Sequence, residues 1–271
     1  MSVHLVLIDA LNLIRRIYAV QERPFLLNNE LADNTKKQVL DNTESACMKA
    51  LANIIELQSP THALAVFDSQ EPCWRYKLYP DYKKGRKRMP AHLADKLSDI
   101  QDQFMTLHVD SLTPEEDEAD DIITTLAIKV ALRGQNVTVI STDKCFLSLL
   151  NKNISVYDYF NRRYLDQDFV HEKFNVRSDQ LLELWTLTGD STNKIPGVPG
   201  IGQVTASALL KQYGSLACIL KATDLKSTVK EKLDNHLEQI ELSQKLLSLK
   251  QDIPLGFNLK DIRLPQPVVN V

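Results

Sequence analysis

The sequence predicts an α/β protein with a mostly parallel sheet flanked by helices on both faces. The prediction rests on three short apolar runs, at residues 3–8, 63–67 and 137–141, each the length of a buried strand and rich in Val, Ile or Leu. Segments with helical spacing separate these runs, and such alternation is typical of parallel sheets. The functional crevice of a parallel sheet lies beyond the carboxyl ends of its strands.

The helical segments between the strands are expected at residues 44–57, 93–107 and 121–132. The polar segment 28–37 is expected to form a mobile loop.

The second half of the chain follows a different pattern. After Tyr164 it is helical to about Gln251, around a Gly/Pro-rich turn at residues 195–202. Residues 254–271 are expected to be irregular apart from one short strand.

Length and composition are those of a soluble globular protein: 271 residues, 44% hydrophobic and 25% charged, with a net charge of -3. The four cysteines are widely spaced and form no CxxC pair, which indicates reduced thiols in a cytoplasmic protein. The first apolar run has no basic leader and Asp9 interrupts it, so it predicts a strand and not a signal peptide. No apolar stretch approaches the roughly 20 residues that span a bilayer.

An aspartate follows each predicted strand: Asp9, Asp68 and Asp143. The segment Glu118-Ala-Asp-Asp121 opens the next helix. Each feature alone has an ordinary explanation, because acidic residues match the dipole of a helix start and a strand-end aspartate caps the helix that follows. Together they place five carboxylates in one crevice, where their charges repel unless cations neutralise them. Oxygen ligands favour Mg²⁺ or Mn²⁺ over zinc, and Mg²⁺ pairs about 4 Å apart commonly serve phosphodiester hydrolysis.

A strongly basic segment follows Asp68. Residues 75–88 hold seven Lys or Arg against one Asp, a local charge of +6, so the rest of the chain carries -9. Such runs are usually solvated surface, but this one would overhang the acidic crevice and contact the phosphates of a single strand. Tyr79 and Tyr82 either stack on bases or pack the base of the segment.

Three glycines, Gly197, Gly200 and Gly202, lie in the turn between helices expected at 179–187 and 204–213. They permit backbone conformations closed to other residues. The turn can offer amides to a phosphate, offer carbonyls to a monovalent cation, or simply connect two helices. The spacing favours the phosphate site at the start of the following helix.

In their order along the chain, these motifs resemble the 5′-nuclease (flap endonuclease-like) family over nearly its whole length. Each motif is weak alone, but the combination is highly specific. The matching segments are Ile8-Asp9 with Leu13 to Arg16, Phe67-Asp68, Tyr82-Lys83 with Arg86, Glu118 to Asp121, Ser141 to Lys144, and Gly189-Asp190 through Gly202. Residues 9–16 with 193–196 are especially similar to a branch of small bacterial proteins.

The resemblance implies a PIN-like nuclease domain over residues 1–165, with a basic helical arch near 71–92. It implies a helical, DNA-binding 5′-3′ exonuclease-type region over 166–255, which contains a helix–three-turn–helix, and a tail over 256–271. The implied activity is Mg²⁺-dependent cleavage of 5′-flapped or branched DNA near the junction, in replication and repair, by a monomer.

The resemblance also implies two Mg²⁺ ions, one of them held directly by the protein and replaceable by Mn²⁺, and one K⁺ ion. The implied Mg²⁺ ligands are Asp9, Asp68, Glu118, Asp120, Asp121, Asp143 and Asp190, of which Asp120 is the most direct. Lys83 and Arg86 are the implied catalytic residues at the scissile phosphate. The implied K⁺ ligands are the carbonyls of Leu187, Thr188, Pro196, Val198 and Ile201. The implied DNA contacts are Arg15, Arg16, Gly200, Ile201, Gly202, Gln203, Val204 and Thr205.

The sequence departs from the family pattern at the second metal site. Cys145 and Asn193 replace two of its three carboxylates, and only Asp190 is kept. A thiol is a poor Mg²⁺ ligand and an amide supplies less charge, so water and substrate are expected to hold the second ion. Ala10 replaces a glycine, a small change that should be tolerated.

A structure-specific 5′ flap endonuclease is therefore the leading expectation. The alternative is a weakly active or inactive protein that binds flapped DNA, which the two losses at the second site favour. A PIN-like ribonuclease is a third possibility, and the glycine turn makes it less favourable.

Overall fold

A six-stranded sheet lies at the centre of the computed structural model, which describes residues 2–25, 32–69 and 71–265. The strand order is β3-β2-β1-β4-β5-β6, and all neighbours are parallel except β5 and β6. The strands are β1 (His4–Asp9), β2 (His62–Val66), β3 (Asp110–Leu112), β4 (Asn136–Ile140), β5 (Ile154–Asp158) and β6 (Arg163–Tyr164).

The three apolar runs form β1, β2 and β4, so the predicted α/β class and mostly parallel sheet are confirmed. The remaining strands escape a search for apolar runs. β3 is three residues long and begins with Asp110, and β6 is two residues long. β5 mixes Ser155 and Asp158 with its apolar residues.

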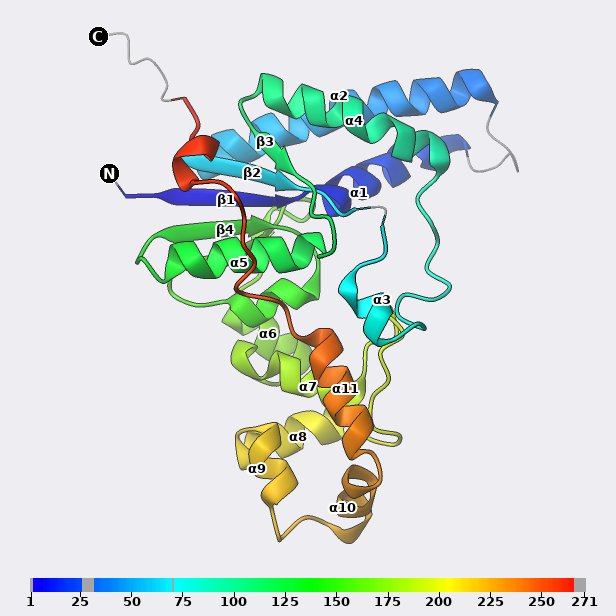
Figure 1. Ribbon diagram of the computed structural model, residues 1–271, viewed down its shortest axis with the longest axis vertical. Helices are drawn as coiled ribbons and strands as arrows, with labels where there is room; N and C mark the ends of the chain where they lie inside the picture. The colour runs from blue at the N-terminus through cyan, green and yellow to red at the C-terminus, as the bar shows by residue number, and fades with distance from the viewer. Residues whose placement is uncertain (1, 26–31, 70, 266–271) are drawn as a thin grey trace.

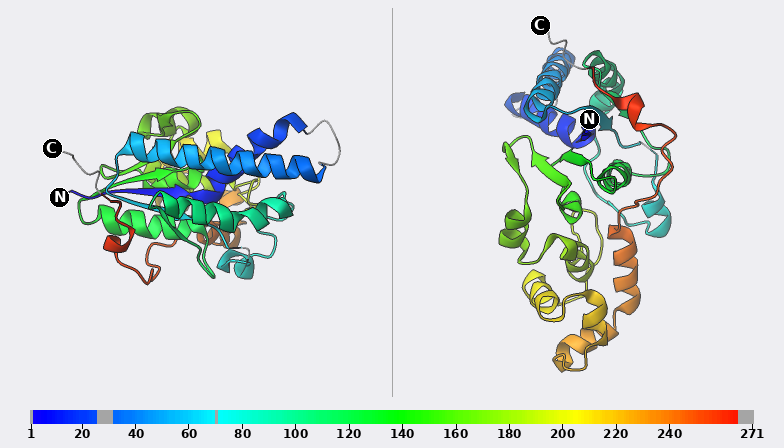
Figure 2. Two further views of the ribbon diagram at one scale, coloured as in Figure 1. Left: turned by 90° about the horizontal axis from the view of Figure 1, so that it is seen from above. Right: turned by 90° about the vertical axis from the view of Figure 1, so that its left-hand side faces the viewer.

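The two faces of the sheet bury alternate side chains, as a strand's period of two requires. Val6 and Ile8 pack in one core with α1, α2 and α4, whereas Leu5 and Leu7 pack in another with α5. The sheet therefore lies between helical layers, which Figure 2 shows from above. The helices are α1 (Ala10–Glu22), α2 (Asp33–Gln58), α4 (Ala91–Thr106) and α5 (Ala119–Ala131).

Helix α2 corrects one prediction. It begins at Asp33, which forms an ion pair with Lys36 at 2.9 Å, so the expected loop at 28–37 is helical in its second half. The start of that loop, residues 28–31, lies outside the described residues. The helices predicted at 93–107 and 121–132 correspond to α4 and α5.

The C-terminal helices extend away from the sheet toward the lower end of the molecule (Figure 1). Helix α7 packs against both α8 and α11. The helical pattern expected after Tyr164 is therefore confirmed as far as Leu247. The helices are α6 (Gln167–Phe174), α7 (Leu181–Thr188), α8 (Gln203–Tyr213), α9 (Leu216–Lys221), α10 (Ser227–Asp234) and α11 (Leu237–Leu247).

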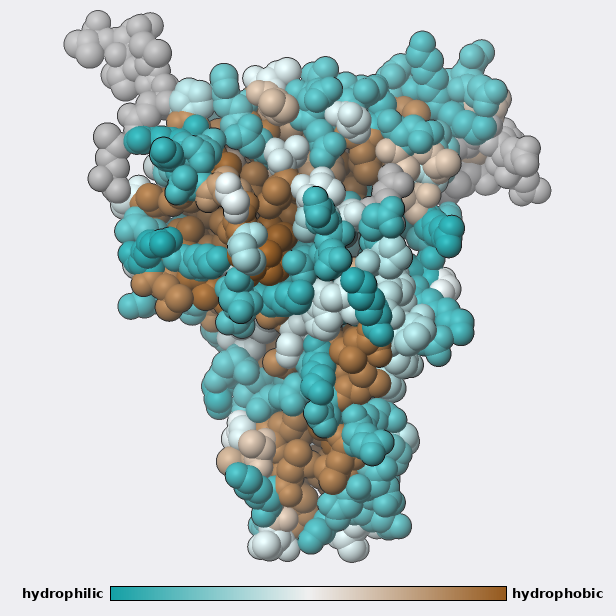
Figure 3. Space-filling view, in the orientation of Figure 1, coloured by the Kyte–Doolittle hydropathy of each residue, from teal (hydrophilic) through white to brown (hydrophobic). Residues whose placement is uncertain are grey.

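After α11, residues 248–265 form a return segment that runs back along α5 to the sheet (Figure 1). The Thr125 hydroxyl and the Lys129 ammonium of α5 donate to carbonyls of this segment at 3.2 and 2.9 Å. The segment crosses the apolar surface over α5 that the space-filling view shows (Figure 3). In place of the expected strand, the described part forms a short 3₁₀ turn and one bridge between Arg263 and His62.

The basic segment forms a short helix, α3 (Trp74–Leu78), and then a turn at residues 80–85. Tyr82 is 4% exposed and packs with Cys73, Ile195 and Leu246. Of the two alternatives for Tyr82, packing at the base of the segment is therefore the correct one. Among the described residues, no helix is long and apolar enough to cross a bilayer.

Candidate metal and nucleic-acid site

Three aspartates lie at the carboxyl-terminal edge of the sheet, where β2, β1 and β4 end side by side. Asp9, the last residue of β1, is 7% exposed and accepts a hydrogen bond from the Ser141 hydroxyl at 2.7 Å. Asp68 follows β2 and accepts from the Ala119 amide at 2.8 Å. Asp143 follows β4 and is exposed. The parallel strand order brings all three to one edge.

Helix α5 points its N-terminus at this edge and contributes two more carboxylates. Glu118 is its N-cap residue, and Asp120 lies in its first turn. Burial, followed by the negative charges of Asp143, Asp9, Asp68 and Glu118, raises the pKa of Asp120 well above its ordinary value. The five carboxylates therefore form one electrostatic cluster.

Asp9 is affected in the same way. Burial raises its pKa to about 7, and the charges of Asp68 and Asp143 act in the same direction, although the bond from Ser141 opposes them. The carboxylates of the cluster thus repel one another, and a bound cation would relieve this repulsion.

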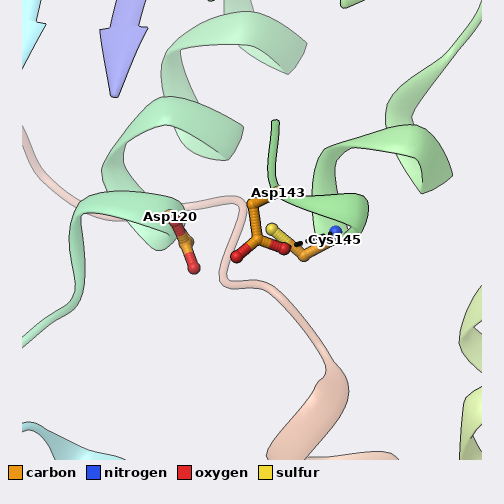
Figure 4. Close-up of side chains that lie close together, drawn as sticks. All are labelled: Asp120, Asp143 and Cys145. Carbon is orange, nitrogen blue, oxygen red and sulfur yellow. Dashed lines mark hydrogen bonds between the residues drawn. The ribbon is translucent and has the colours of Figure 1, made fainter. Parts of the chain in front are cut away.

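The ligand atoms of Asp120, Asp143 and Cys145 all lie within 4.8 Å of one another (Figure 4). Asp143 also accepts a hydrogen bond from the Cys145 amide at 2.9 Å. Burial, and then the neighbouring carboxylates, raise the pKa of the Cys145 thiol well above its ordinary value. The sulfur therefore faces the cluster as a neutral thiol.

The donor set fits a hard divalent cation. The five carboxylates offer only oxygen atoms, which Mg²⁺ and Mn²⁺ prefer. Their mutual repulsion leaves negative charge for a cation to neutralise. The protonated thiol of Cys145 adds neither charge nor a hard ligand.

Two cationic side chains, a buried one and a half-buried one, balance the charge of Glu118. The Arg75 guanidinium contacts its Oε2 at 2.5 Å, and the Lys83 ammonium contacts its Oε1. The Tyr82 hydroxyl donates to Oε2 at 3.1 Å. Burial alone would raise the pKa of Glu118, but Lys83 and Arg75 more than offset that effect and hold it below its ordinary value.

Asp121 faces away from this cluster toward Arg75. Its Oδ1 and Oδ2 each accept from the Arg75 guanidinium at 2.8 Å. The Trp74 indole and the Lys250 amide donate to it as well, both at 3.0 Å. Asp121 is fully buried and both of its oxygens are bound to Arg75, so it serves this ion pair and does not join the five carboxylates of the cluster.

Arg16 and Arg86, two of the four basic side chains that the family resemblance singles out, line a groove beside the cluster. Lys83 has a left-handed backbone with φ 54°, and its amide donates to the Asn193 carbonyl at 2.9 Å. Arg86 and Arg16 are exposed and line the groove. Arg15 is half-buried and donates to the Lys87 carbonyl at 3.1 Å, which links α1 to the basic segment.

A groove of about 620 Å³ runs from the carboxylate cluster toward the C-terminal helices. Asp120, Asp143 and Cys145 line it, and so do Asp190 and Asn193. The Asp190 carboxylate accepts from the Asn193 side chain at 2.7 Å, so the amide occupies an oxygen that a cation would otherwise share.

The glycine turn joins α7 to α8 through close backbone contacts. An added Cβ at Gly197 would lie 2.1 Å from the Thr188 carbonyl carbon. Three of the five carbonyls singled out for K⁺ already accept hydrogen bonds: Leu187 from the Val198 amide, Val198 from the Ile201 amide, and Pro196 from the Ser243 hydroxyl.

The residues singled out for DNA contact lie at the start of α8. Gly202 is its N-cap, and Gly200, Gln203 and Val204 are exposed. Thr205 is half-buried, and Ile201, at 4% exposure, offers only its backbone.

Sequence reasoning missed the part that Arg75 plays in this site. It counted Arg75 with the exposed charges of the basic segment, yet the side chain is 3% exposed and bound to two carboxylates. No sequence signal separates it from its neighbours, because its partners are far away along the chain.

Family models match the chain over its length. An N-terminal resolvase-like domain of 5′-3′ exonucleases matches residues 4–175, and a C-terminal SAM fold of 5′-3′ exonucleases matches residues 176–270. The resemblance inferred from the motifs is confirmed.

Curated relatives and solved structures agree with this match. The protein called flap endonuclease Xni from Colwellia psychrerythraea is 67% identical over 269 residues, which is 97% of this chain and 93% of that protein. The protein of the same name from Photobacterium profundum is 46% identical over 98% of this chain and 99% of its own. A structure of the T5 5′-exonuclease with bound zinc superposes with a TM-score of 0.74 at 21% identity, covering 90% of this chain and 89% of that one.

Proposed function

Because the chain belongs to the 5′-3′ exonuclease family, whose members are nucleases that hydrolyse phosphodiester bonds, we propose that it is a Mg²⁺-dependent, structure-specific 5′ flap endonuclease. The observation that carries the proposal is the convergence of five carboxylates at one sheet edge, beside a groove bordered by the basic segment. The names of the relatives support the choice of a 5′ flap as the substrate.

Asp9, Asp68, Glu118, Asp120 and Asp143 would hold the first Mg²⁺. When bound, the metal supplies activation of the attacking water and stabilisation of the leaving oxygen. The chain's own contribution is to gather these carboxylates on rigid strand and helix ends, so that no reorganisation is needed at the moment of reaction.

Lys83 and Arg86 would bind the scissile phosphate. Lys83 is 15% exposed and pairs with Glu118, so a phosphate could draw its ammonium away from that carboxylate. Arg86 is exposed at the same groove and would add a second positive charge.

The second cation would rest mainly on water and substrate, with Asp190 as its remaining carboxylate. The neutral Cys145 thiol and the Asn193 amide support this depleted second site. The same two residues support the alternative, a protein that binds flapped DNA and cleaves it weakly or not at all.

The C-terminal helices would hold the duplex. Residues 200–205 would offer amides at the start of α8 to the DNA backbone, and Arg15 and Arg16 would contact it near α1. The carbonyls of Leu187, Thr188, Pro196, Val198 and Ile201 would bind a K⁺ ion between the turn and the DNA. We take residues 1–165, 166–255 and 256–271 as nuclease domain, DNA-binding region and tail of a monomer.

The test is cleavage of a 5′-flap DNA in Mg²⁺ with parent and Asp120→Ala protein. We expect cuts near the junction by the parent, loss of cutting in Asp120→Ala, and normal cutting in Asp102→Ala, which changes an exposed aspartate of α4. No cleavage by excess parent enzyme, with tight flap binding intact, would favour the binding protein instead.

A further inference from the structure

Arg75 lies buried between three parts of the molecule. It belongs to α3 in the basic segment, and its side chain is 3% exposed. The guanidinium donates to Glu118 at 2.5 Å and to both oxygens of Asp121 at 2.8 Å. It also donates to the carbonyls of Leu246 and Ser248, at 2.8 and 3.0 Å. Every direction of its planar fork is therefore engaged.

The two carboxylates that Arg75 binds lie in the first turn of α5. Asp121 closes a capping box with Glu118, so the fork holds the start of the helix and its N-cap side chain together. The guanidinium also lies over the Trp74 indole, with 4.3 Å to the ring centroid, and this cation–π contact holds the indole in place. Arg75 and Lys83 thus contact different oxygens of Glu118, Oε2 and Oε1 respectively.

The contacts to α11 serve a different purpose. Leu246 lies in the last turn of that helix, where carbonyls lack an intrahelical partner. Arg75 supplies the missing donor and places a positive charge at the negative end of the helix dipole. The Lys250 amide, two residues beyond Ser248, donates to the same Asp121 at 3.0 Å. The end of α11 is thereby bonded to the carboxylate site.

We propose that Arg75 is a positioning residue: it sets the Glu118 carboxylate within the cluster and bonds α3 to the end of α11. The inference rests on the proposed function, because it assigns Glu118 to the metal site of a nuclease. Together with the Lys250 amide, Arg75 joins the end of α11 to the site, so a change at the end of α11 moves Glu118.

The experiment compares the full-length parent with Arg75→Lys and Arg75→Gln. Arg75→Lys keeps the charge but loses the fork, and Arg75→Gln loses both. Arg177→Lys is the matched control, because Arg177 makes the same forked contact with Asp179, at 3.0 Å for both bonds, but on the exposed surface. The readouts are the single-turnover rate on a 5′ flap, the Mg²⁺ midpoint of that rate, flap affinity in Ca²⁺, and thermal unfolding.

For Arg75→Lys we expect the rate to fall by about tenfold to a hundredfold. We expect the Mg²⁺ midpoint to rise by about tenfold, as when a residue that orients a metal ligand is lost. Flap affinity should stay within about threefold of the parent value, since both variants leave the start of α8 untouched. Arg75→Gln should show larger effects, and Arg177→Lys should match the parent in every readout.

A parental rate and Mg²⁺ midpoint in Arg75→Lys would overturn the proposal. A lower yield of active molecules with an unchanged midpoint would also overturn it, because that result describes a purely structural arginine. If the parent itself does not cut flap DNA, the proposed function fails. The positioning role of Arg75 is then tested by Mn²⁺ binding, measured by water proton relaxation. Weaker Mn²⁺ binding by Arg75→Lys then supports the positioning role, and equal binding overturns it.

Discussion

The Cys145 sulfur and an Asp120 carboxylate oxygen lie within 4.8 Å of each other, and both residues line the groove. Burial and the charge of Asp120 raise the pKa of the thiol, so it remains protonated near neutral pH. The uncharged Cys145 sulfur therefore lies beside the carboxylate cluster. A negatively charged side chain at the same position would attract a second cation.

Restoring charge at the second site should speed cleavage. We expect Cys145→Asp combined with Asn193→Asp to raise the single-turnover rate by about tenfold, since a carboxylate ligand lets a second ion share the developing charge. The measurement is a rate profile across a Mg²⁺ titration. Cys145→Ser is the control, because it changes the atom without adding charge. A double variant that follows the parent profile at every Mg²⁺ concentration would contradict the depleted-site account.

The stability of the metal-free protein should fall as the pH rises from about 4 to about 7. The pKa of Asp9 is raised to about 7 in the folded protein, against about 3.9 when unfolded. The folded state binds more protons than the unfolded state in this range. The stabilisation from Asp9 is therefore complete below its unfolded pKa and is lost as the pH rises through its folded pKa.

The pH effect can be followed by thermal unfolding with EDTA or Mg²⁺ at pH 6 and pH 8. Mg²⁺ should raise the Tm more at pH 8, where the ionised cluster repels itself most. Asp120→Asn should raise the metal-free Tm at pH 8, by about 2–4 °C for each kcal/mol gained. Equal Mg²⁺ effects at the two pH values would argue against the cluster as the metal site.

Potassium should tighten DNA binding more than sodium does at equal ionic strength. The carbonyls of Leu187, Pro196 and Val198 are held in place by bonds from within the chain, and each keeps a second lone pair for an ion. The measurement is flap affinity in matched KCl and NaCl solutions with Ca²⁺. Identical affinities would leave only ionic screening and remove the cation role of the turn.

Gly197 should tolerate no side chain. A Cβ there would lie 2.1 Å from the Thr188 carbonyl carbon and 2.4 Å from the Gly189 nitrogen, so the turn must open. We expect Gly197→Ala to destabilise the protein by about 1–3 kcal/mol, as overpacking does. For comparison, Gly202→Ala meets nothing within 4 Å at φ -92° and should keep the parental Tm. Similar unfolding curves for the two variants would show that the turn is not tightly packed.

Particular residues show how far the sequence allowed prediction. β1, β2 and β4 were predictable because each is a run of apolar residues that ends near an aspartate. β3, β5 and β6 were not, because short edge pairing depends on the neighbouring strand more than on local composition. Asp33 shows the same limit for helices, since α2 begins in a polar stretch that sequence alone assigns to a loop.

The sequence by itself determined the fold class, the order of the motifs and the family, because buried strands and strand-end aspartates are local features. Only the tertiary structure decided which charges meet. It pairs Asp121 with Arg75 and leaves Asp120 facing Asp143 and Cys145, although Asp120 and Asp121 are neighbours in one helix turn. Arg75 and Leu246 are 171 residues apart, and their contact exists only when α3, α5 and α11 have packed together.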